Sequence, residues 1–236
     1  MHLLPRTIRE AIPRVHREGL PFIVGTVILA VGFGIVWEPA FWLLMFLVGW
    51  MVIFFRNPVR VVPLDDGLVV SPADGRVEPI IRCIPPVELG LGDEPLTRVS
   101  VFMNVFDCHI SRAPVAGNVL RIIYTPGKFF SADMDKASDD NERNAVVIGA
   151  DRGMVVGVVQ IAGLVARRIV CWTSVGDRLE AGERFGMIRF GSRLDVYLPE
   201  GSVVTASWRQ RAVSGETILA YLPGARPSAP FETRFD

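Results

Sequence analysis

The sequence predicts a mainly β fold, in which a sheet-rich domain follows an N-terminal hydrophobic helical hairpin. Two observations lead to this prediction. Nearly all of the apolar excess lies between residues 20 and 55, and the chain from Arg56 onward consists of short β-like runs separated by Gly, Pro and Asp. No long helical period interrupts these runs, so a sandwich or barrel is favoured over a doubly wound fold.

The overall composition limits the classes of function. The chain has 236 residues, with 25 basic and 25 acidic side chains and a formal net charge of zero. A balanced charge gives no support to broad binding of a phosphate backbone, so nucleic acid is not an expected partner. Hydrophobic residues make up 50% of the chain and the mean hydropathy is +0.36, which indicates that part of the chain meets lipid.

A membrane-associating region is expected over residues 1–55, with the hydrophobic hairpin at 20–55. Each apolar half is about as long as a helix needs to cross a bilayer, and Glu38-Pro39 is the expected turn between them. Arginines flank the hairpin on both sides, which predicts that the rest of the chain lies at the cytoplasmic face of the cell membrane. They are Arg6, Arg9, Arg14 and Arg17 before the hairpin and Arg56 and Arg60 after it. A cleaved signal peptide is the alternative, but no small-residue cleavage site follows the first apolar segment.

A folded domain is expected over residues 56–222, followed by a Pro-rich tail, 223–236, that is expected to be disordered. Short apolar runs bounded by turn residues predict the strands of this domain. They lie at 68–71, 76–84, 98–104, 118–125, 145–148, 155–162, 168–172, 184–190, 194–198, 203–207 and 217–222.

The cysteines and lysines exclude several kinds of chemistry. The three cysteines, Cys83, Cys108 and Cys171, lack metal-ligand spacing, so neither a disulfide framework nor a metal site is expected. The only lysines are Lys128 and Lys136, and neither lies in the setting that a pyridoxal phosphate enzyme requires. An enzyme that acts on a substrate amine through a Schiff base would therefore need a carbonyl other than that of pyridoxal phosphate.

Three residues of the sheet-rich domain are candidates for catalysis. His109 is the only histidine after the hairpin, and an imidazole is the side chain best suited to proton transfer near neutral pH. Asp74 lies in a Pro-Ala-Asp-Gly turn, where it could hydrogen-bond its own backbone instead. Ser192 follows Gly191 between two β-like runs and could equally be an ordinary turn serine.

Six motifs, in this order, resemble those of the phosphatidylserine decarboxylase family, in its short bacterial and archaeal type. They are FFRNP, SPADGRV, FDCHISRAP, YTPGKFFSADMDKASDDNERN, QIAGLVARRIV and GDRLEAGERFGMIRFGSR. The resemblance implies a proenzyme that cuts itself between Gly191 and Ser192, leaving a β chain of residues 1–191 and an α chain of residues 192–236. It also implies that Ser192 becomes a covalent pyruvoyl group. This group would supply the carbonyl that pyridoxal phosphate supplies in other enzymes.

The resemblance further implies how these residues act. Ser192 would attack the Gly191 carbonyl, with His109 as base and Asp74 orienting the imidazole, by the logic of a Ser-His-Asp triad. In the mature enzyme the amine of phosphatidylserine would form a Schiff base with the pyruvoyl group, which takes up the electrons left by CO2. Reprotonation, with His109 as donor, and hydrolysis would give phosphatidylethanolamine, a step of phospholipid biosynthesis. Only the Gly-Ser core of the cleavage motif matches the longer relatives, because Phe190 and Arg193 flank it here.

The residues that hold the headgroup are less clearly marked. The polar stretch 128–144 offers Lys128, Lys136 and Arg143 as substrate-binding residues, although a solvated loop with surface ion pairs explains the same composition. The expected partners are phosphatidylserine, membrane lipid, the α and β chains of one precursor and a second copy of the chain in a homodimer.

Two other classes of function compete with the decarboxylase. GDRLEAGERFGMIRFGS resembles the barrel-sandwich pattern of lipoyl and biotinyl carriers, so the fold is expected to be barrel-sandwich-hybrid-like, and a membrane-tethered carrier or adaptor without catalysis is one rival. A carrier needs a modifiable lysine at the hairpin tip, where this chain has Gly191, Ser192 and Arg193. A membrane serine protease is the other rival, and it would cut other chains rather than only its own.

Overall fold

The computed structural model describes residues 14–127, 141–150, 153–163, 168–189, 192–225 and 232–235. The chain divides into two compact units, Met1–Pro58 and Val59–Asp236. The first unit contains the helical hairpin, and the second contains all of the described strands.

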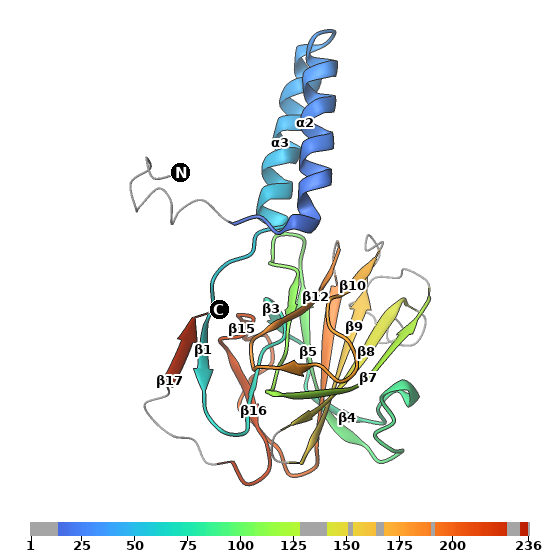
Figure 1. Cartoon of the computed structure of the whole chain (residues 1–236), viewed down its shortest axis with the longest axis vertical. Coiled ribbons are helices and arrows are strands. Elements are labelled where there is room, and N and C mark those ends of the chain that lie inside the picture. Colours follow the sequence, from blue (N-terminus) through green and yellow to red (C-terminus); the bar gives the residue numbers. More distant parts are fainter. Residues whose placement is uncertain are drawn as a thin grey trace. The chain divides into compact units, whose positions relative to one another are not determined.

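The helical hairpin consists of two apolar helices. A short 3-10 helix, η1 (Arg17–Gly19), leads into α2 (Leu20–Gly34), and α3 (Glu38–Phe54) runs back beside it (Figure 1). The three residues after α2 make the turn, so the expected turn at Glu38-Pro39 is corrected by a few residues. Pro39 fits the first turn of α3 because its missing N–H would have no helical partner there.

Backbone contacts close the base of the hairpin. Val15 and Arg56 form an antiparallel bridge, and the His16 N–H donates to the Phe55 carbonyl at 2.8 Å. Gly19 is required at this point because a Cβ there would lie 2.5 Å from Phe55 Cβ. The segments that enter and leave the hairpin are therefore held together.

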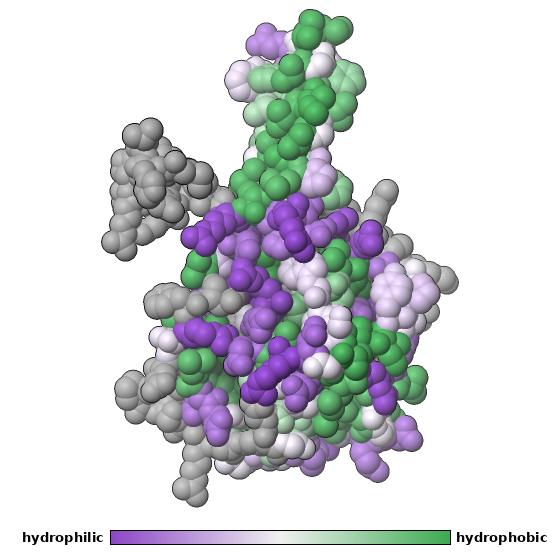
Figure 2. Space-filling model, in the orientation of Figure 1, coloured by the Kyte–Doolittle hydropathy of each residue, from purple (hydrophilic) through white to green (hydrophobic). Residues whose placement is uncertain are grey.

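The surface of the hairpin is strongly apolar (Figure 2). Among the described residues, one helix, Arg17–Gly34, has both the length and the hydropathy to cross a membrane, and Glu38–Phe54 is apolar but shorter. Large side chains such as Val36 and Phe46 are about four-fifths exposed. A continuous apolar surface of this kind is typical of a segment that contacts lipid or another protein.

The second unit is built from short strands. They are β1 (Val61–Leu64), β2 (Leu68–Val70), β3 (Gly75–Val77), β4 (Ile81–Cys83), β5 (Leu96–Met103), β6 (Ile110–Arg112), β7 (Gly117–Thr125), β8 (Arg143–Ala150), β9 (Val155–Ala162), β10 (Ile169–Cys171), β11 (Arg178–Leu179), β12 (Arg184–Ile188), β13 (Ser192–Leu198), β14 (Val203–Val204), β15 (Arg211–Ala212), β16 (Ile218–Tyr221) and β17 (Glu232–Phe235), with a 3-10 helix η2 (Val87–Leu89) between β4 and β5.

One large, curled antiparallel sheet organises this unit (Figure 1). Its strand order is β11-β7-β8-β9-β13-β5-β3-β15, with β4 also pairing β5. Two three-stranded sheets, β10-β12-β6 and β14-β16-β2, complete the domain together with the β1-β17 pair. The mainly β prediction with apolar helices at the N-terminus is confirmed.

Strand β13 lies in the middle of the large sheet and is covered on both faces. Its residues Leu194, Val196 and Leu198 belong to the main apolar core, whereas Tyr197 packs into a second, smaller apolar cluster. All seven residues of the strand are buried. This coverage explains why Ser192, its first residue, has no contact with solvent.

The C-terminal segment differs in part from the expectation of a disordered tail over 223–236. Residues Glu232–Phe235 form β17 and pair antiparallel with β1, with Val62 opposite Arg234. Arg234 also donates to the Ala181 carbonyl at 2.7 Å. The Pro-rich composition predicts an irregular segment. Its final Glu-Thr-Arg-Phe run nevertheless pairs with the edge of β1.

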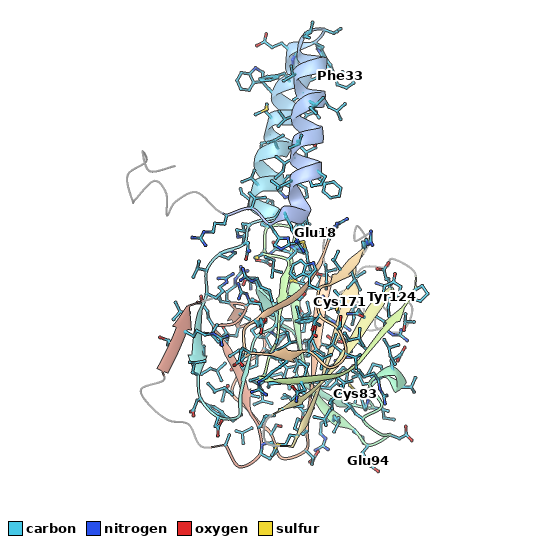
Figure 3. All side chains as sticks on the ribbon, viewed as in Figure 1. Glu18, Phe33, Cys83, Glu94, Tyr124 and Cys171 are labelled. Atoms are coloured by element: carbon cyan, nitrogen blue, oxygen red, sulfur yellow. The ribbon has the colours of Figure 1, made fainter. Side chains whose placement is uncertain are left out.

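The three cysteines, all within the described residues, form no disulfide bond. Cys108 is buried, whereas Cys83 and Cys171 are partly buried and come from different strands (Figure 3). Within the described residues, no group of three or more His, Cys, Asp and Glu side chains could hold a metal ion.

Candidate active site

Ser192 is the residue around which the site is built. It is fully buried at the start of β13, opposite Met103 of β5 on one side and Ala162 of β9 on the other. Its hydroxyl lies 3.9 Å from Met103 Sδ, which is a weak hydrogen-bond acceptor. The nucleophile predicted from the sequence therefore lies in a dry position in the centre of the sheet. Gly191, the other half of the predicted cleavage site, lies outside the described residues.

His109 lies beside the strand that leads to Ser192. The histidine is fully buried just before β6, and its carbonyl accepts from the Ile188 N–H at 3.2 Å. Ile188 ends β12, three residues before Gly191. The pairing of β6 with β12 thus brings the only imidazole of the folded domain next to the segment that carries the predicted cleavage site.

One contact of the His109 ring indicates its tautomer. Nδ1 lies 2.9 Å from the backbone oxygen of Asp107. A carbonyl oxygen can only accept, so Nδ1 carries the hydrogen and Nε2 of the neutral ring keeps its lone pair. That tautomer presents Nε2 as a proton acceptor, which is what a general base requires.

Asp74 is held by Arg60 and by a backbone N–H. The Arg60 Nη2 lies 2.7 Å from both carboxylate oxygens of Asp74, and the Ser214 N–H donates to Oδ1 at 2.8 Å. Asp74 is almost completely buried and Arg60 nearly so. A buried carboxylate needs such partners, because its charge would otherwise be desolvated without compensation.

The turn that carries Asp74 lies one strand away from Ser192. Gly75 packs so closely on β5 that a Cβ there would lie 2.1 Å from the Phe102 carbonyl oxygen. Phe102 precedes Met103, the β5 residue opposite Ser192. Strand pairing therefore brings the turn, β5 and the start of β13 together. A direct contact between Asp74 and His109 stays a prediction, since the contacts described above join each of them to other groups.

A chain of buried amides lies next to the predicted nucleophile. Asn144 Nδ2 donates to Gln160 Oε1 at 2.9 Å, and Gln160 Nε2 donates to Ser111 Oγ at 2.9 Å. Gln160 is paired with Leu194, two residues from Ser192 on the same face of β13, and Ser111 is two residues from His109. The contact between Gln160 and Ser111 thus joins β9 to β6 close to both predicted catalytic residues.

A second set of charged residues supports β13 from its other face. Arg193 donates to both oxygens of Asp195, at 2.9 Å and 3.1 Å, and all of these groups are buried. Burial, together with the charge of Asp195, raises the pKa of the Tyr197 hydroxyl, so this phenol stays neutral at physiological pH. The residues that follow Ser192 are therefore fixed on both faces of the strand.

Of the three predicted substrate-binding residues, only Arg143 lies within the described residues, and the strand pairing does not bring it to Ser192. Arg143, on β8, is opposite Ile161 of β9, so its side chain lies on the face of the sheet opposite that of Ser192. It forms an ion pair with Glu88 instead. Lys128 and Lys136 lie outside the described residues. Contact between any of the three and substrate stays a prediction.

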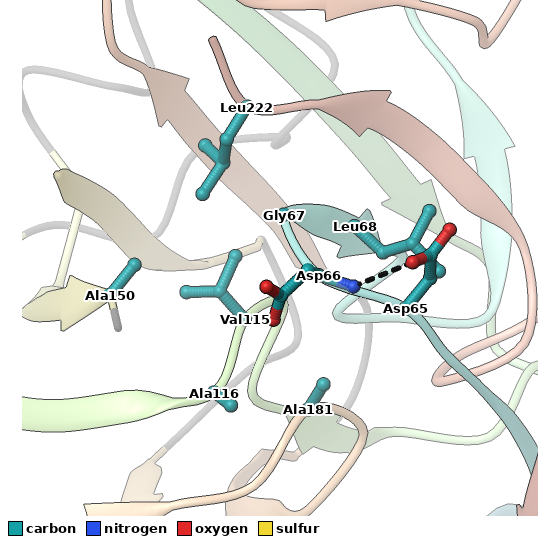
Figure 4. A pocket seen from close by; sticks show the side chains of 9 residues that line it. All are labelled: Asp65, Asp66, Gly67, Leu68, Val115, Ala116, Ala150, Ala181 and Leu222. Atoms are coloured by element: carbon teal, nitrogen blue, oxygen red, sulfur yellow. Dashed lines mark hydrogen bonds between the residues drawn. The ribbon is translucent and has the colours of Figure 1, made fainter. Parts of the chain in front are cut away.

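A small pocket elsewhere in the domain does not include the predicted site residues. It measures about 60 Å³, enough for a few water molecules, and Asp65 and Asp66 line one side (Figure 4). The Asp66 N–H donates to Asp65 Oδ1 at 2.8 Å, as in an ordinary turn. The remaining lining residues are Gly67, Leu68, Val115, Ala116, Ala150, Ala181 and Leu222.

The fold and the site together define an enzyme: a mainly β domain that buries a serine at the start of one strand, a histidine just before another, and an aspartate, paired with an arginine, in a turn. The family model for phosphatidylserine decarboxylase matches residues 47–220. This chain therefore belongs to the phosphatidylserine decarboxylase family, and its activity is the decarboxylation of phosphatidylserine. The match covers most of the sheet-rich domain and includes Asp74, His109 and Ser192, so the decarboxylase reading is favoured over a carrier or a protease.

Sequence reasoning missed the residues that hold the predicted catalytic groups. The sequence marks Arg60 only as a positive charge flanking the hairpin, although its position just after the FFRNP motif is a signal. Asp107 acts through its backbone oxygen, which no residue pattern reveals. Gln160 and Ser111 come from motifs about 50 residues apart, and only the strand order places them in contact.

Proposed function

We propose that the chain is a proenzyme that cuts its own backbone between Gly191 and Ser192 and decarboxylates phosphatidylserine with the pyruvoyl group created at residue 192. The observation that carries this proposal is the burial of Ser192 at the first position of a central strand, with β6 and His109 beside the strand that leads to it. The family's known use of a pyruvoyl group supports it.

Self-cleavage needs a base and an acid, and His109 can serve as both. The Ser192 hydroxyl loses its proton to His109 Nε2 as its oxygen attacks the Gly191 carbonyl carbon. The peptide C–N bond breaks, the nitrogen takes the proton back, and an ester joins the two residues. Loss of the Cα proton of residue 192 then expels Gly191 as a carboxylate and leaves dehydroalanine, from which water releases ammonia.

The surroundings of Ser192 fit a pyruvoyl group. Ala162 and Met103, the two residues opposite it, are uncharged, and the site is closed to solvent. After the cut, residue 192 becomes a chain end, but the hydrogen bonds of β13 to β5 and β9 and the pairing of Arg193 with Asp195 still hold it in place. The pieces of the precursor would therefore remain one folded domain.

In the decarboxylation that follows self-cleavage, the pyruvoyl group and the side chains of the protein have different roles. When present, the pyruvoyl group supplies the carbonyl that takes up the substrate amine and the electrons released as CO2 departs. The buried site excludes water, and His109 would hold the proton that returns to the substrate Cα. The ion pair with Arg60 balances the negative charge of Asp74.

The membrane setting follows from the substrate. Phosphatidylserine and its product phosphatidylethanolamine are membrane lipids, and the apolar hairpin would keep the enzyme at their surface. We place the sheet-rich domain at the cytoplasmic face because arginines flank the hairpin on both sides. The enzyme would act in phospholipid biosynthesis.

The test is a denaturing gel of the purified full-length chain and two variants. The wild-type protein should separate into chains of residues 1–191 and 192–236. Ser192→Ala should remain whole and inactive, and His109→Ala should be cut at least a hundredfold more slowly, given the usual contribution of a general base. Cys108→Ala, a buried change next to His109, is the matched control and should be cut like wild type.

Two results would contradict the proposal. One is an active wild-type preparation that consists of a single intact chain. The other is normal cutting of His109→Ala, which would remove the histidine from the processing step while leaving the identity of the nucleophile to the Ser192→Ala result.

A further inference from the structure

The turn between β5 and β6, which leads to His109, exposes two apolar side chains. Phe106 is 65% exposed and Val105 38% exposed. Three residues after Phe106, His109 is fully buried. Isolated exposed apolar residues are common on protein surfaces, so this pair has meaning only if the turn holds it in place and its surroundings favour a partner.

Hydrogen bonds and one ion pair close the turn. The Asp107 N–H donates to the Asn104 carbonyl at 3.0 Å, and the Asn104 N–H donates to Asp107 Oδ2 at 2.9 Å. The Phe106 N–H donates to Asn104 Oδ1 at 2.8 Å. Arg211 of β15 pairs with the other oxygen of Asp107 at 2.5 Å. Val105 and Phe106 thus lie at the end of a turn whose backbone is closed by these bonds.

Two arginines, Arg76 and Arg211, lie near the base of this turn. Arg211 is opposite Arg76, and Arg76 is opposite Phe102, one residue before Met103. Arg76 is exposed, and within the part of the chain that the structure describes it forms no ion pair. Two like charges directly across a strand pair destabilise a sheet unless an anion lies near. Arg76, Arg211 and Asp107 together carry one net positive charge.

We propose that Val105 and Phe106, which we name the apolar tip, insert into the interfacial region of a bilayer that contains anionic phospholipid. The tip supplies apolar contact with acyl chains, and Arg76 and Arg211 face the negative headgroups. The same turn carries the Asp107 oxygen that binds the His109 ring. Contact with lipid is therefore made by the segment that positions the proposed base, so that a lipid substrate need not leave the membrane to reach it.

This inference rests on the decarboxylation of a membrane lipid and not on how the pyruvoyl group forms. Its first test therefore reads out contact rather than activity. The full-length chain would carry the photoreactive residue p-benzoylphenylalanine at position 106 and would be irradiated on vesicles of phosphatidylserine and phosphatidylcholine. Position 203, where the native Val203 is 63% exposed on β14, is the matched control. Cross-linked lipid should appear at position 106 and be absent at position 203.

The second test uses kinetics. Phe106→Ser should raise KM for phosphatidylserine in vesicles by roughly three- to tenfold, as expected for loss of part of the burial of one aromatic side chain. Self-cleavage and turnover of a short-chain, water-soluble phosphatidylserine should not change. Val203→Ser should match wild type on both substrates.

Three outcomes would overturn the proposal. They are equal cross-linking at the two positions, cross-linking of position 106 to a second copy of the chain in place of lipid, and an equal loss of activity on soluble and vesicle substrates. A chain that never cuts itself would contradict the proposed function, yet the cross-linking result would still decide whether the tip meets the bilayer.

Discussion

At the scale of single residues, the candidate site depends on how a buried carboxylate and a buried imidazole are held. Asp74 has its two oxygens bound by Arg60 and the Ser214 N–H, and His109 has Nδ1 bound by a backbone oxygen. Neither arrangement relies on solvent. Of these partners, Arg60 is the one whose side chain can be replaced, because the other two are backbone groups.

Arg60 is the neighbour whose removal is most informative. Arg60→Met leaves the Asp74 carboxylate buried without its cation, which typically costs about 3–5 kcal/mol of stability. We expect a chain that unfolds at lower denaturant concentration and cuts itself at least tenfold more slowly. Arg60→Lys, which restores the charge without the planar guanidinium, should recover part of both. Chemical denaturation and timed gels measure the two effects.

A double variant separates a positioning role from a general loss of stability. If Arg60 acts through Asp74, Arg60→Met should slow self-cleavage very little further in a chain that already carries Asp74→Asn. Additive slowing of cleavage in the double variant would show that Arg60 affects the site by some other route.

The sequence singles out Ser192 and His109 as candidates because each lies in a local motif. Ser192 follows a glycine between two apolar runs, and His109 is the only histidine beyond the hairpin. The partners could not be found in this way. Arg60 contacts a residue 14 positions away, and Arg211 contacts one 104 positions away, so those contacts exist only once the sheet has formed.

At the scale of elements, an ion pair links η2 to β8. Burial alone would raise the pKa of the Glu88 carboxyl, but the hydrogen bond and the charge of Arg143 outweigh it and hold the pKa below its usual range. A carboxyl whose pKa is lowered by folding stabilises the folded state at neutral pH. That contribution is lost as the pH falls through the lowered pKa, below about 4.3.

The corresponding prediction compares wild type with Glu88→Gln. The variant should be less stable than wild type at pH 7, and the difference should shrink as the pH falls below 4, because both chains then carry a neutral side chain at residue 88. Melting temperatures across this range measure it. Glu200→Gln, which removes an exposed partner of Arg82, is the control and should change little at any pH. A constant difference between Glu88→Gln and wild type would contradict the assigned cause.

The hairpin and the longer strands are predicted from the sequence, whereas the short strands β1, β6, β11 and β15 and the C-terminal strand β17 are not. Two of the differences have simple causes. The hairpin turn comes before Glu38-Pro39 because proline is accommodated inside the first turn of a helix. Strand β17 was not expected because its composition is that of a loop, and only the free edge of β1 gives it a partner. Local composition shows where a chain can turn, but it does not show which edge a late segment will meet.

At the scale of the whole molecule, the exposed apolar hairpin should determine where the protein is found. The full-length chain should float with phosphatidylserine-containing vesicles in a density gradient. Ile28→Asp places a charge on a largely exposed position of α2 and should reduce the floating fraction several-fold, given a cost of about 2.5–3.5 kcal/mol for a charged residue at the centre of a membrane helix. Val203→Asp in the sheet-rich domain should float like wild type. Equal flotation of both variants would show that the hairpin does not anchor the protein.

The central claim concerns one bond. The most direct measurement is the intact mass of the chains in a freshly purified, active preparation. We predict a chain of residues 192–236 that is one ammonia lighter than the same chain beginning with serine, and that has no free amine at its N-terminus. A single chain with the mass of the full sequence, in a preparation that converts phosphatidylserine, would contradict the account.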